Sequence, residues 1–243
     1  MDGAAKNLQA EVPENDFDKY LAETKANWNR QLGKIEVKGS NEDDKVNFYT
    51  ALYHSMIAPT IYNDVDGAYY GPDKKVHQAD GWVNYSTFSL WDTYRAAHPL
   101  RTLIDQKKEE DIIASYLLMA EQMGNMWMPT FPEVTGDTRR MNSNHAVATI
   151  ADALAKGLKV DTAKAYEACR KGIEEKTLAP WSGAAAGWLD NFYRENGYIP
   201  ALRPDEKESD PNVHPFEKRQ PVAVTLGTSY DQWCLSRIAE ALG

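Results

Sequence analysis

Residues 85–100 bring together side chains of the kinds that bind sugars. Trp91, Asp92 and Arg95 lie close together in this stretch. If residues 88–97 are helical, Trp91 and Arg95 share one face, and Phe88 and Asp92 share the neighbouring face. A flat ring covers the apolar C–H face of a sugar, and a fixed carboxylate accepts hydrogen bonds from its hydroxyls. The spacing therefore predicts a carbohydrate site here.

The same residue types also have structural roles. A buried tryptophan beside an Asp–Arg pair is an ordinary anchor for the start of a helix, and residues 85–100 alone do not separate the two interpretations. His145 begins another predicted helix, where a hydrogen-bonded structural histidine is more common than a catalyst.

Two further segments carry candidate polar and aromatic side chains. Residues 125–143 hold Trp127, Glu133 and Asp137 in one irregular loop, because two prolines in it exclude a helix. Asp231 lies near the start of the last predicted helix, where it either points into a site or caps that helix; the cap is the favoured interpretation.

Composition limits the classes of function. The chain has 243 residues and a net charge of −9, so it lacks the basic surface that nucleic acid requires. No stretch is long and apolar enough for a membrane span, and none near the N-terminus is typical of a signal peptide. The two cysteines, Cys169 and Cys234, are expected to be buried free thiols.

The hydrophobic pattern predicts an all-α protein built from antiparallel helix pairs. Residues 1–14 are expected to be a linker or the tail of an upstream domain, and residues 15–243 the helical domain. Residues 63–67 resemble a calcium loop without its closing glutamate and are expected to form a turn. The predicted helices are 16–32, 40–58, 88–97 (kinked or split by Pro99), 107–123, 144–156, 161–178, 188–196 and 229–242.

Two features of the last third of the chain are also predicted. A long polar connection is expected over residues 179–224, interrupted by the helix 188–196. The final helix is expected to turn Tyr230, Trp233, Cys234 and Ile238 inward.

Several stretches together resemble glycoside hydrolase family 92, a family of calcium-dependent exo-acting α-mannosidases. They are residues 28–32, 48–54, 88–100, 144–153 and 230–234. The resemblance implies that the chain is about half of an (α/α)6 toroid, with an N-terminal β-sandwich before it and further barrel helices after it. It also implies an inverting α-mannosidase, with α-1,2 linkage expected, acting on N-glycan or mannan oligosaccharides. Export to the periplasm or medium and a Ca²⁺ cofactor follow from it too, with no calcium ligand assigned in this chain.

The resemblance also suggests roles for individual residues. The family's proton donor is a glutamate in a Glu-Thr-x-x-Met run, and Asp137 to Met141 occupy that place, so the acid would be Asp137, one methylene shorter. Glu133 is the second candidate, and the structural alternative pairs Asp137 with a neighbouring arginine. Trp91 and Asp92 would contact the terminal mannose, with Arg95 orienting Asp92 and with Trp127 and Asp231 nearby.

This chain differs from the family pattern in two ways that leave other functions open. Gly227 stands where many relatives carry a glutamate, and the family's catalytic base lies beyond Gly243, so this chain alone is expected to be inactive. One alternative is a carbohydrate-binding or scaffold protein that has lost catalysis. In that case the aspartate at the position of the family's acid, Asp137, reflects the loss. The other is a helical toroid without a sugar role, in which the aromatic side chains are core.

Overall fold

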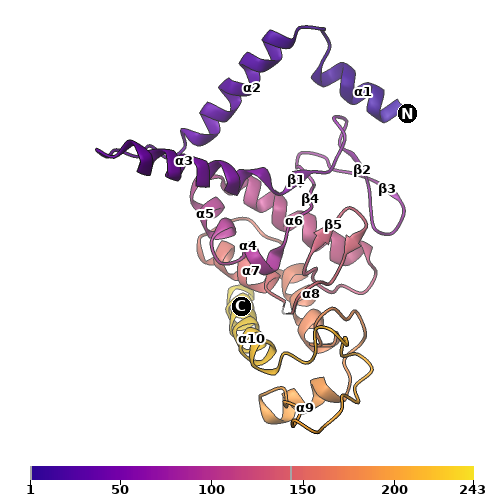
Figure 1. Cartoon of the computed structure of the whole chain (residues 1–243). Coiled ribbons are helices and arrows are strands. Elements are labelled where there is room, and N and C mark those ends of the chain that lie inside the picture. The colour runs from indigo at the N-terminus through magenta and orange to yellow at the C-terminus, as the bar shows by residue number, and fades with distance from the viewer. Residues whose placement is uncertain (1, 143) are drawn as a thin grey trace.

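The computed structural model describes residues 2–142 and 144–243. Within them the chain is rich in helix, with three small antiparallel sheets of two strands each (Figure 1). The all-α prediction is therefore confirmed at the level of fold class. None of the helices in the described ranges is both long and apolar enough to cross a membrane.

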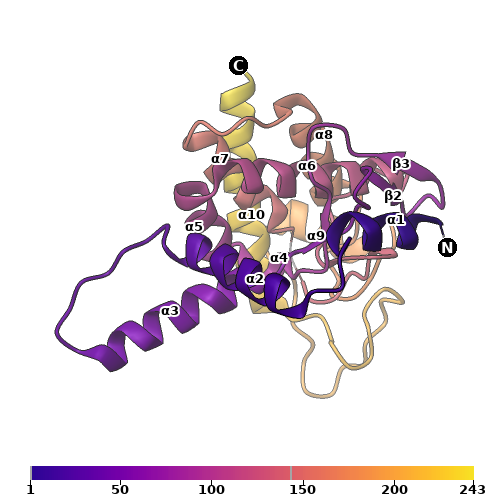
Figure 2. The same ribbon diagram turned by 90° about the horizontal axis from the view of Figure 1, so that it is seen from above.

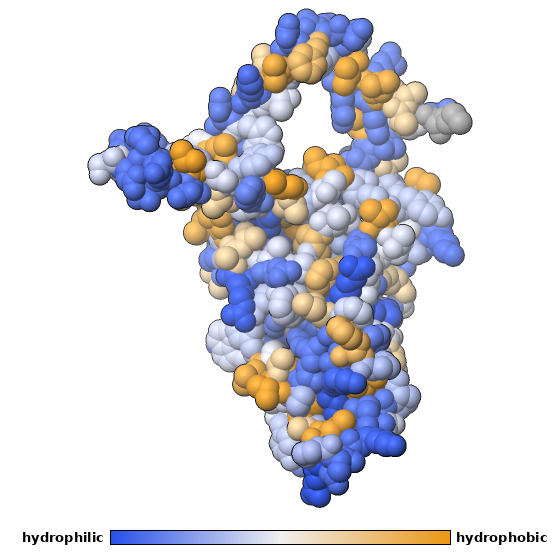
Figure 3. Space-filling view, in the orientation of Figure 1, coloured by the Kyte–Doolittle hydropathy of each residue, from blue (hydrophilic) through white to orange (hydrophobic). Residues whose placement is uncertain are grey.

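Three N-terminal helices form an arm above the body (Figures 1 and 3). They are α1 (Asp2–Glu11), α2 (Phe17–Leu32) and α3 (Glu42–Ile57). Asp16 caps α2 by accepting a hydrogen bond from the Lys19 amide, as its sequence position predicts. Leu52 is the one described residue of these helices that is buried, and Figure 3 shows an open gap between the arm and the body. The arm therefore has little core of its own.

The body is a cluster of helices around one core. It contains α5 (Ala97–Ile104), α6 (Gln106–Gln122), α7 (Ala146–Ala155), α8 (Thr162–Glu174) and α10 (Pro221–Leu242). Figure 2 shows α10 running beside α7 and α8, against which it packs. Their apolar faces meet in a core whose fully buried members include Ile112, Tyr116, Val147, Ile150 and Ile238.

The loops beside this core contain three short antiparallel strand pairs. β1 (Thr60–Ile61) pairs with β4 (Tyr85–Ser86), and β2 (Ala68–Tyr70) pairs with β3 (Val76–Gln78). The turn predicted at residues 63–67 is present, with Gly67 in the left-handed region that favours glycine. β5 (Pro132–Glu133) and β6 (Gly136–Asp137) form a hairpin within the loop 125–143.

The connection between α8 and α10 has a small core of its own. α9 (Trp188–Asn196) lies in it, with the bounds that the sequence predicts. A cluster of buried apolar residues includes the inner face of α9 and residues on either side of it. The long irregular connection that the sequence predicts is present, in residues 197–220. The cluster consists of Leu178, Ala179, Leu189, Tyr193, Ile199, Val213 and Val224.

Three expectations need correction. The central helix is split as expected, but the break comes before Pro99 and not at it: α4 (Leu90–Thr93) is a single turn, and α5 begins at Ala97. Pro99 lies in the first turn of α5, where proline is tolerated. The last helix begins at Pro221, eight positions before the expected start at Ser229. Tyr230 and Trp233, expected to face inward, are 43% and 57% exposed.

Candidate active site

An open cavity of about 870 Å³ lies where α4, the start of α5, α7 and α10 meet. Its wall mixes aromatic rings, two carboxylates, an arginine and amide side chains, which is the composition expected of a sugar site. The lining residues that matter here are Trp91, Asp92, Tyr94, Arg95, Asn142, His145, Asp152, Gln220, Gly227 and Tyr230.

The single turn of α4 presents Trp91 and Asp92 to the cavity. Ser89 caps this turn, because its hydroxyl accepts a hydrogen bond from the Asp92 amide at 3.2 Å. The indole Nε1 of Trp91 donates to Oδ1 of Asn142 at 3.4 Å. The Asp92 carboxylate is exposed and accepts no hydrogen bond from another side chain in the described part of the chain, so its oxygens are available to a ligand.

Arg95 lies on the same wall but is not bonded to Asp92. Its guanidinium lies over the Tyr94 ring, 5.2 Å from the ring centroid. Burial raises the pKa of the Tyr94 phenol, and the nearby Arg95 charge opposes that rise. In this arrangement Arg95 contributes positive charge to the cavity wall, and its expected role of orienting Asp92 remains a prediction.

A buried hydrogen-bonded pair supports the floor of the cavity. His145 stacks on Tyr94 with ring centroids 3.9 Å apart, and its Nδ1 lies 2.7 Å from Oδ1 of Asp231. Asp231 is fully buried and also accepts from the Asn144 amide at 2.7 Å. It therefore acts from behind the cavity: it holds the start of α7 and does not cap its own helix.

The opposite rim belongs to α10. The side-chain amide of Asn142 donates to Oε1 of Gln220 at 2.6 Å. This hydrogen bond joins the loop 125–143 to the start of α10. Burial raises the pKa of Tyr230 to about 12, so its phenol stays protonated and can donate a hydrogen bond over the physiological range. Gly227 contributes no side chain to this rim, and the other lining residues between Gln220 and Tyr230 are the apolar Ala223 and Leu226.

Asp137 fixes the loop 125–143. Its Oδ1 accepts from the backbone amides of Thr130, Phe131 and Arg139 at 3.1, 2.9 and 2.9 Å, and its side chain is 2% exposed. Oδ2 lies 4.0 Å from Nε of Arg139, a long ion pair. Arg139 and Met141 both have positive φ, so these hydrogen bonds hold a backbone that non-glycine residues rarely adopt.

The remaining candidates of the same loop also lie away from the cavity wall. Glu133 accepts from the Thr138 hydroxyl at 3.3 Å, at the end of β5. Trp127 is half-buried, and its indole N–H is buried without a hydrogen-bond partner among the described residues. The structure thus brings Trp91, Asp92 and Arg95 together and sets Trp127, Glu133 and Asp137 apart from them.

Several lining residues were not predicted as site residues, although Asn142 and Asp152 lie in stretches that the sequence analysis singles out. Asn142, Asp152 and Gln220 are isolated polar residues that come together only through the packing of α7 against α10. Tyr94 was visible in the residue 85–100 stretch as a further aromatic beside Trp91.

A second cavity of about 340 Å³ lies between α2, α3 and α5. It is lined by Trp28, Met56, Leu100 and Ile104, with Asp105 at its edge. Asp105 is paired with Lys34 at 2.7 Å, so this cavity lacks the unpaired carboxylate that distinguishes the larger one.

The described residues do not fit a bound metal ion. Over 2–142 and 144–243, no group of three or more His, Cys, Asp or Glu side chains is placed to hold one. The loop once compared with a calcium site uses its carboxylates otherwise: Asp64 accepts from Asn7, and Asp66 pairs with Lys6 at 3.1 Å.

Comparisons with known proteins identify the family of the chain. The family model "Glycosyl hydrolase family 92 catalytic domain" matches residues 3–243. The family GH92 α-mannosidase BT3965 from Bacteroides thetaiotaomicron is similar, with a TM-score of 0.83 and 32% identity over 100% of this chain and 30% of that one. It has also been solved in complex with mannoimidazole. No curated protein matches in sequence.

A second structure, the family GH92 inverting mannosidase BT2199 from Bacteroides thetaiotaomicron VPI-5482, matches with a TM-score of 0.83 and 28% identity, over 100% of this chain and 31% of that one. This chain therefore spans about a third of the length of these relatives. Its helices correspond to part of an (α/α)6 fold. The chain belongs to glycosyl hydrolase family 92.

Proposed function

We propose that the protein containing this chain is an exo-acting α-mannosidase that removes terminal mannose from N-glycan or mannan, with α-1,2 linkages as its first expected substrate. The observation that carries the proposal is the placement of Trp91 and Asp92 on the wall of the large cavity. A tryptophan ring can cover the apolar face of mannose while the unpaired carboxylate accepts its hydroxyls. The mannoimidazole complex of BT3965 supports a mannose-shaped ligand by similarity.

We further propose an inverting mechanism, by similarity to the inverting mannosidase BT2199. Inversion needs a protonated carboxyl at the leaving oxygen and a second carboxylate to activate water, about 6.5–9.5 Å apart. Asp137 could serve as the donor only if Oδ2 or a rearranged loop reached the cavity, because Oδ1 accepts three amide hydrogen bonds. Glu133 is the other candidate of this loop, and the base is expected outside these residues.

Calcium is part of the proposal at the level of the whole protein. The side chains of residues 2–142 and 144–243 do not by themselves form a site for it. We therefore expect other parts of the protein to supply ligands to the ion.

The test is hydrolysis of α-mannobioses by the full-length protein, with and without a calcium chelator. Wild type is compared with Asp137→Asn and Asp137→Glu. The asparagine side chain has the same size as that of Asp137. Its oxygen accepts hydrogen bonds more weakly than a carboxylate does, and it has no carboxyl proton to donate to the leaving group. If Asp137 is the acid, Asn abolishes turnover while the fold survives.

A second function is favoured by the bonding of Asp137. A carboxylate used as a loop clamp supports the alternative that the protein binds mannosides without hydrolysing them. In that case wild type binds α-mannobiose in calorimetry but releases no mannose. Gain of turnover in Asp137→Glu would then identify an enzyme that has lost its donor.

A further inference from the structure

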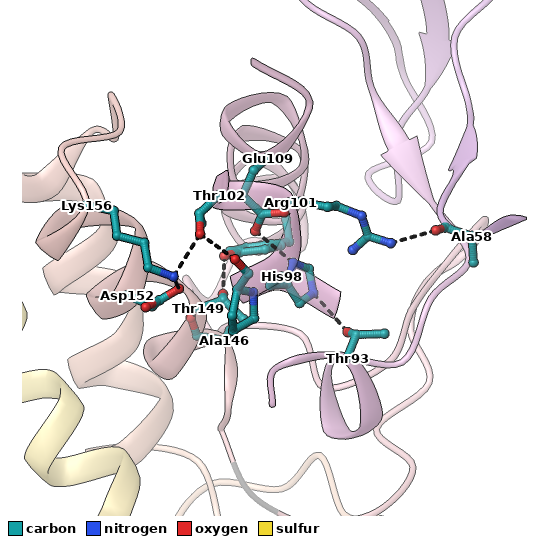
Figure 4. Close-up of polar contacts among 12 residues, drawn as sticks. Ala58, Thr93, His98, Arg101, Thr102, Glu109, Ala146, Thr149, Asp152 and Lys156 are labelled. Atoms are coloured by element: carbon teal, nitrogen blue, oxygen red, sulfur yellow. Dashed lines mark hydrogen bonds and ion pairs between the residues drawn. The ribbon is translucent and has the colours of Figure 1, made fainter. Parts of the chain in front are cut away.

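Behind the wall that carries Trp91 and Asp92 lies a buried polar pair. His98 on α5 and Glu109 on α6 are 1% and 0% exposed, and Nδ1 of His98 lies 2.7 Å from Oε1 of Glu109. Nε2 of the same ring lies 2.8 Å from the Thr93 hydroxyl. Figure 4 shows Thr93, His98 and Glu109 as a continuous row of polar contacts.

The direction of these hydrogen bonds follows from the hydroxyl. Thr93 Oγ1 donates its single proton to the carbonyl of Ser89 at 2.7 Å, so toward His98 it can only accept. Nε2 of His98 therefore carries a proton. One further proton lies between Nδ1 of His98 and Oε1 of Glu109. Both side chains are buried, so the two groups stay paired with each other.

His98 reaches both ends of the segment that carries the sugar-binding candidates. Its ring packs edge-on against Phe88 with centroids 5.9 Å apart, and its Nε2 bonds Thr93 five residues later. Between them, Leu90 is buried, and Trp91 and Asp92 line the cavity. Thr93 is the one residue of 91–95 that does not line it.

We propose that His98 and Glu109 are positioning residues for Trp91 and Asp92: the pair holds Thr93 and thereby fixes the single turn of α4 at the cavity wall. Stability is weak grounds for such a pair, since well-packed apolar side chains of similar volume are often as stabilising as a buried ion pair. α4 has only four residues and cannot hold its shape by itself. The effect on ligand binding rests on the proposed function; the effect on α4 does not.

The first test compares Thr93→Val, which has the same shape without the hydroxyl, with Thr93→Ser, which keeps it. Thr102→Val is the matched control. The Thr102 hydroxyl also makes two hydrogen bonds, donating to the Pro99 carbonyl at 2.6 Å and accepting from Lys156 at 2.8 Å, but it does so away from α4 (Figure 4). Thr102 is fully buried and Thr93 is half-buried, so the control removes a hydroxyl from the drier of the two sites. All are measured in the full-length protein. The readout independent of activity is hydrogen exchange of the backbone amides of residues 90–94.

We expect Thr93→Val to speed exchange in residues 90–94 about tenfold and to weaken mannoside binding by about the same factor or more. Thr93→Ser is expected to keep the exchange rate and the mannoside affinity of wild type, because it keeps the hydroxyl. Thr102→Val is expected to change neither quantity. Equal exchange in the two valine variants, or failure of serine to restore it, overturns the proposal.

The second test addresses the proton pattern of the pair. In Glu109→Gln the side-chain amide can still donate to Nδ1 of a neutral His98, whereas Glu109→Leu removes the partner. Glu109→Gln is expected to keep the slow exchange of residues 90–94 and the mannoside affinity of wild type. Glu109→Leu is expected to speed that exchange and to weaken mannoside binding. Nitrogen NMR of the imidazole is expected to show Nε2 of His98 protonated; an unprotonated Nε2 contradicts the arrangement.

The experiments distinguish failure of the proposed function from failure of the positioning role of His98 and Glu109. If wild type binds and hydrolyses no α-mannoside, the proposed function falls, and hydrogen exchange in α4 still decides the positioning role. If wild type acts on mannosides but Thr93→Val behaves like Thr102→Val in both readouts, the positioning role falls alone.

Discussion

Asp231 on α10 holds His145 on α7: Oδ1 of the carboxylate lies 2.7 Å from Nδ1 of the imidazole. Since a carboxylate only accepts, Nδ1 carries the proton. The second oxygen accepts the Asn144 amide at 2.7 Å. One buried side chain thus fixes the start of α7 and the ring that forms the floor of the cavity.

Asp231→Ala should leave the His145 ring and the Asn144 amide without their acceptor in a dry site. We expect the free energy of unfolding to fall by about 3 kcal/mol. Urea unfolding followed by circular dichroism measures it. Glu240→Ala, on the same helix in the exposed pair with Arg237, is the control and should stay close to wild type. Equal loss in both variants would contradict a structural role for Asp231.

The two cysteines should be unreactive in the folded protein. Both are free and buried, and burial raises the pKa of each thiol, that of Cys234 to about 11. Near pH 8 only roughly one Cys234 side chain in a thousand is then a thiolate, the reactive form. Titration with a chromogenic disulfide should find almost no thiol in native protein and both thiols in guanidinium chloride. Rapid labelling of Cys234 in native protein would contradict this packing.

The loop between α9 and α10 should loosen in acid. Glu208 accepts two hydrogen bonds from Arg219, at 2.7 and 2.9 Å, and these lower the pKa of its carboxyl below the ordinary 4.5. A pKa that is lower in the folded state contributes stability above the unfolded value, and this contribution is lost as the pH falls below about 4.5.

Proteolysis of the loop 200–219 should therefore be slow at neutral pH and faster in acid. Glu208→Gln should make it fast at neutral pH as well, because the charged pair is lost. Glu206→Gln, in the same loop but bonded only to the Arg203 amide, is the control. Slow cleavage in Glu208→Gln would show that the apolar cluster around α9 holds the loop without this pair.

Arg101 should hold the arm to the body. Its guanidinium, on α5, donates to the carbonyls of Ser55 and Ala58 at 3.1 and 2.7 Å, at the end of α3 (Figure 4 shows the Ala58 contact). Because Leu52 is the one buried residue of α3, Arg101→Met should speed amide exchange in residues 42–57 by about tenfold. Arg237→Met on α10 is the control, and unchanged exchange in α3 would contradict the role of Arg101.

Local signals predicted the helices well where a capping residue precedes an amphipathic run. Asp16 caps α2 as expected, and α9 has its predicted bounds. α8 begins at Thr162, close to the predicted start, but ends at Glu174, before the expected end at residue 178. The sugar-binding candidates Trp91, Asp92 and Arg95 were also visible, because their residue types and spacing carry the signal locally. Their common cavity depends on packing between α4, α7 and α10, which the local pattern does not encode.

The last helix shows why the rest was missed. Its buried face follows Val224, Thr228, Asp231, Cys234 and Ile238, a regular helical spacing that includes an aspartate. The expectation that Asp231 caps this helix places the helix start near residue 229 and turns Tyr230 and Trp233 inward. The aspartate is buried because its partners come from α7, 86 and 87 residues earlier in the chain, so tertiary contacts decided the outcome.

The most direct test of the account is calorimetric titration of the full-length protein with mannoimidazole and α-1,2-mannobiose. It compares wild type, Asp92→Asn and the control Asp105→Asn, whose carboxylate lines the smaller cavity. Asp92→Asn should weaken binding at least tenfold, or about 1.4 kcal/mol, and Asp105→Asn should bind as wild type does. Unchanged affinity in Asp92→Asn, or equal loss in both variants, would contradict a mannose site at Trp91 and Asp92.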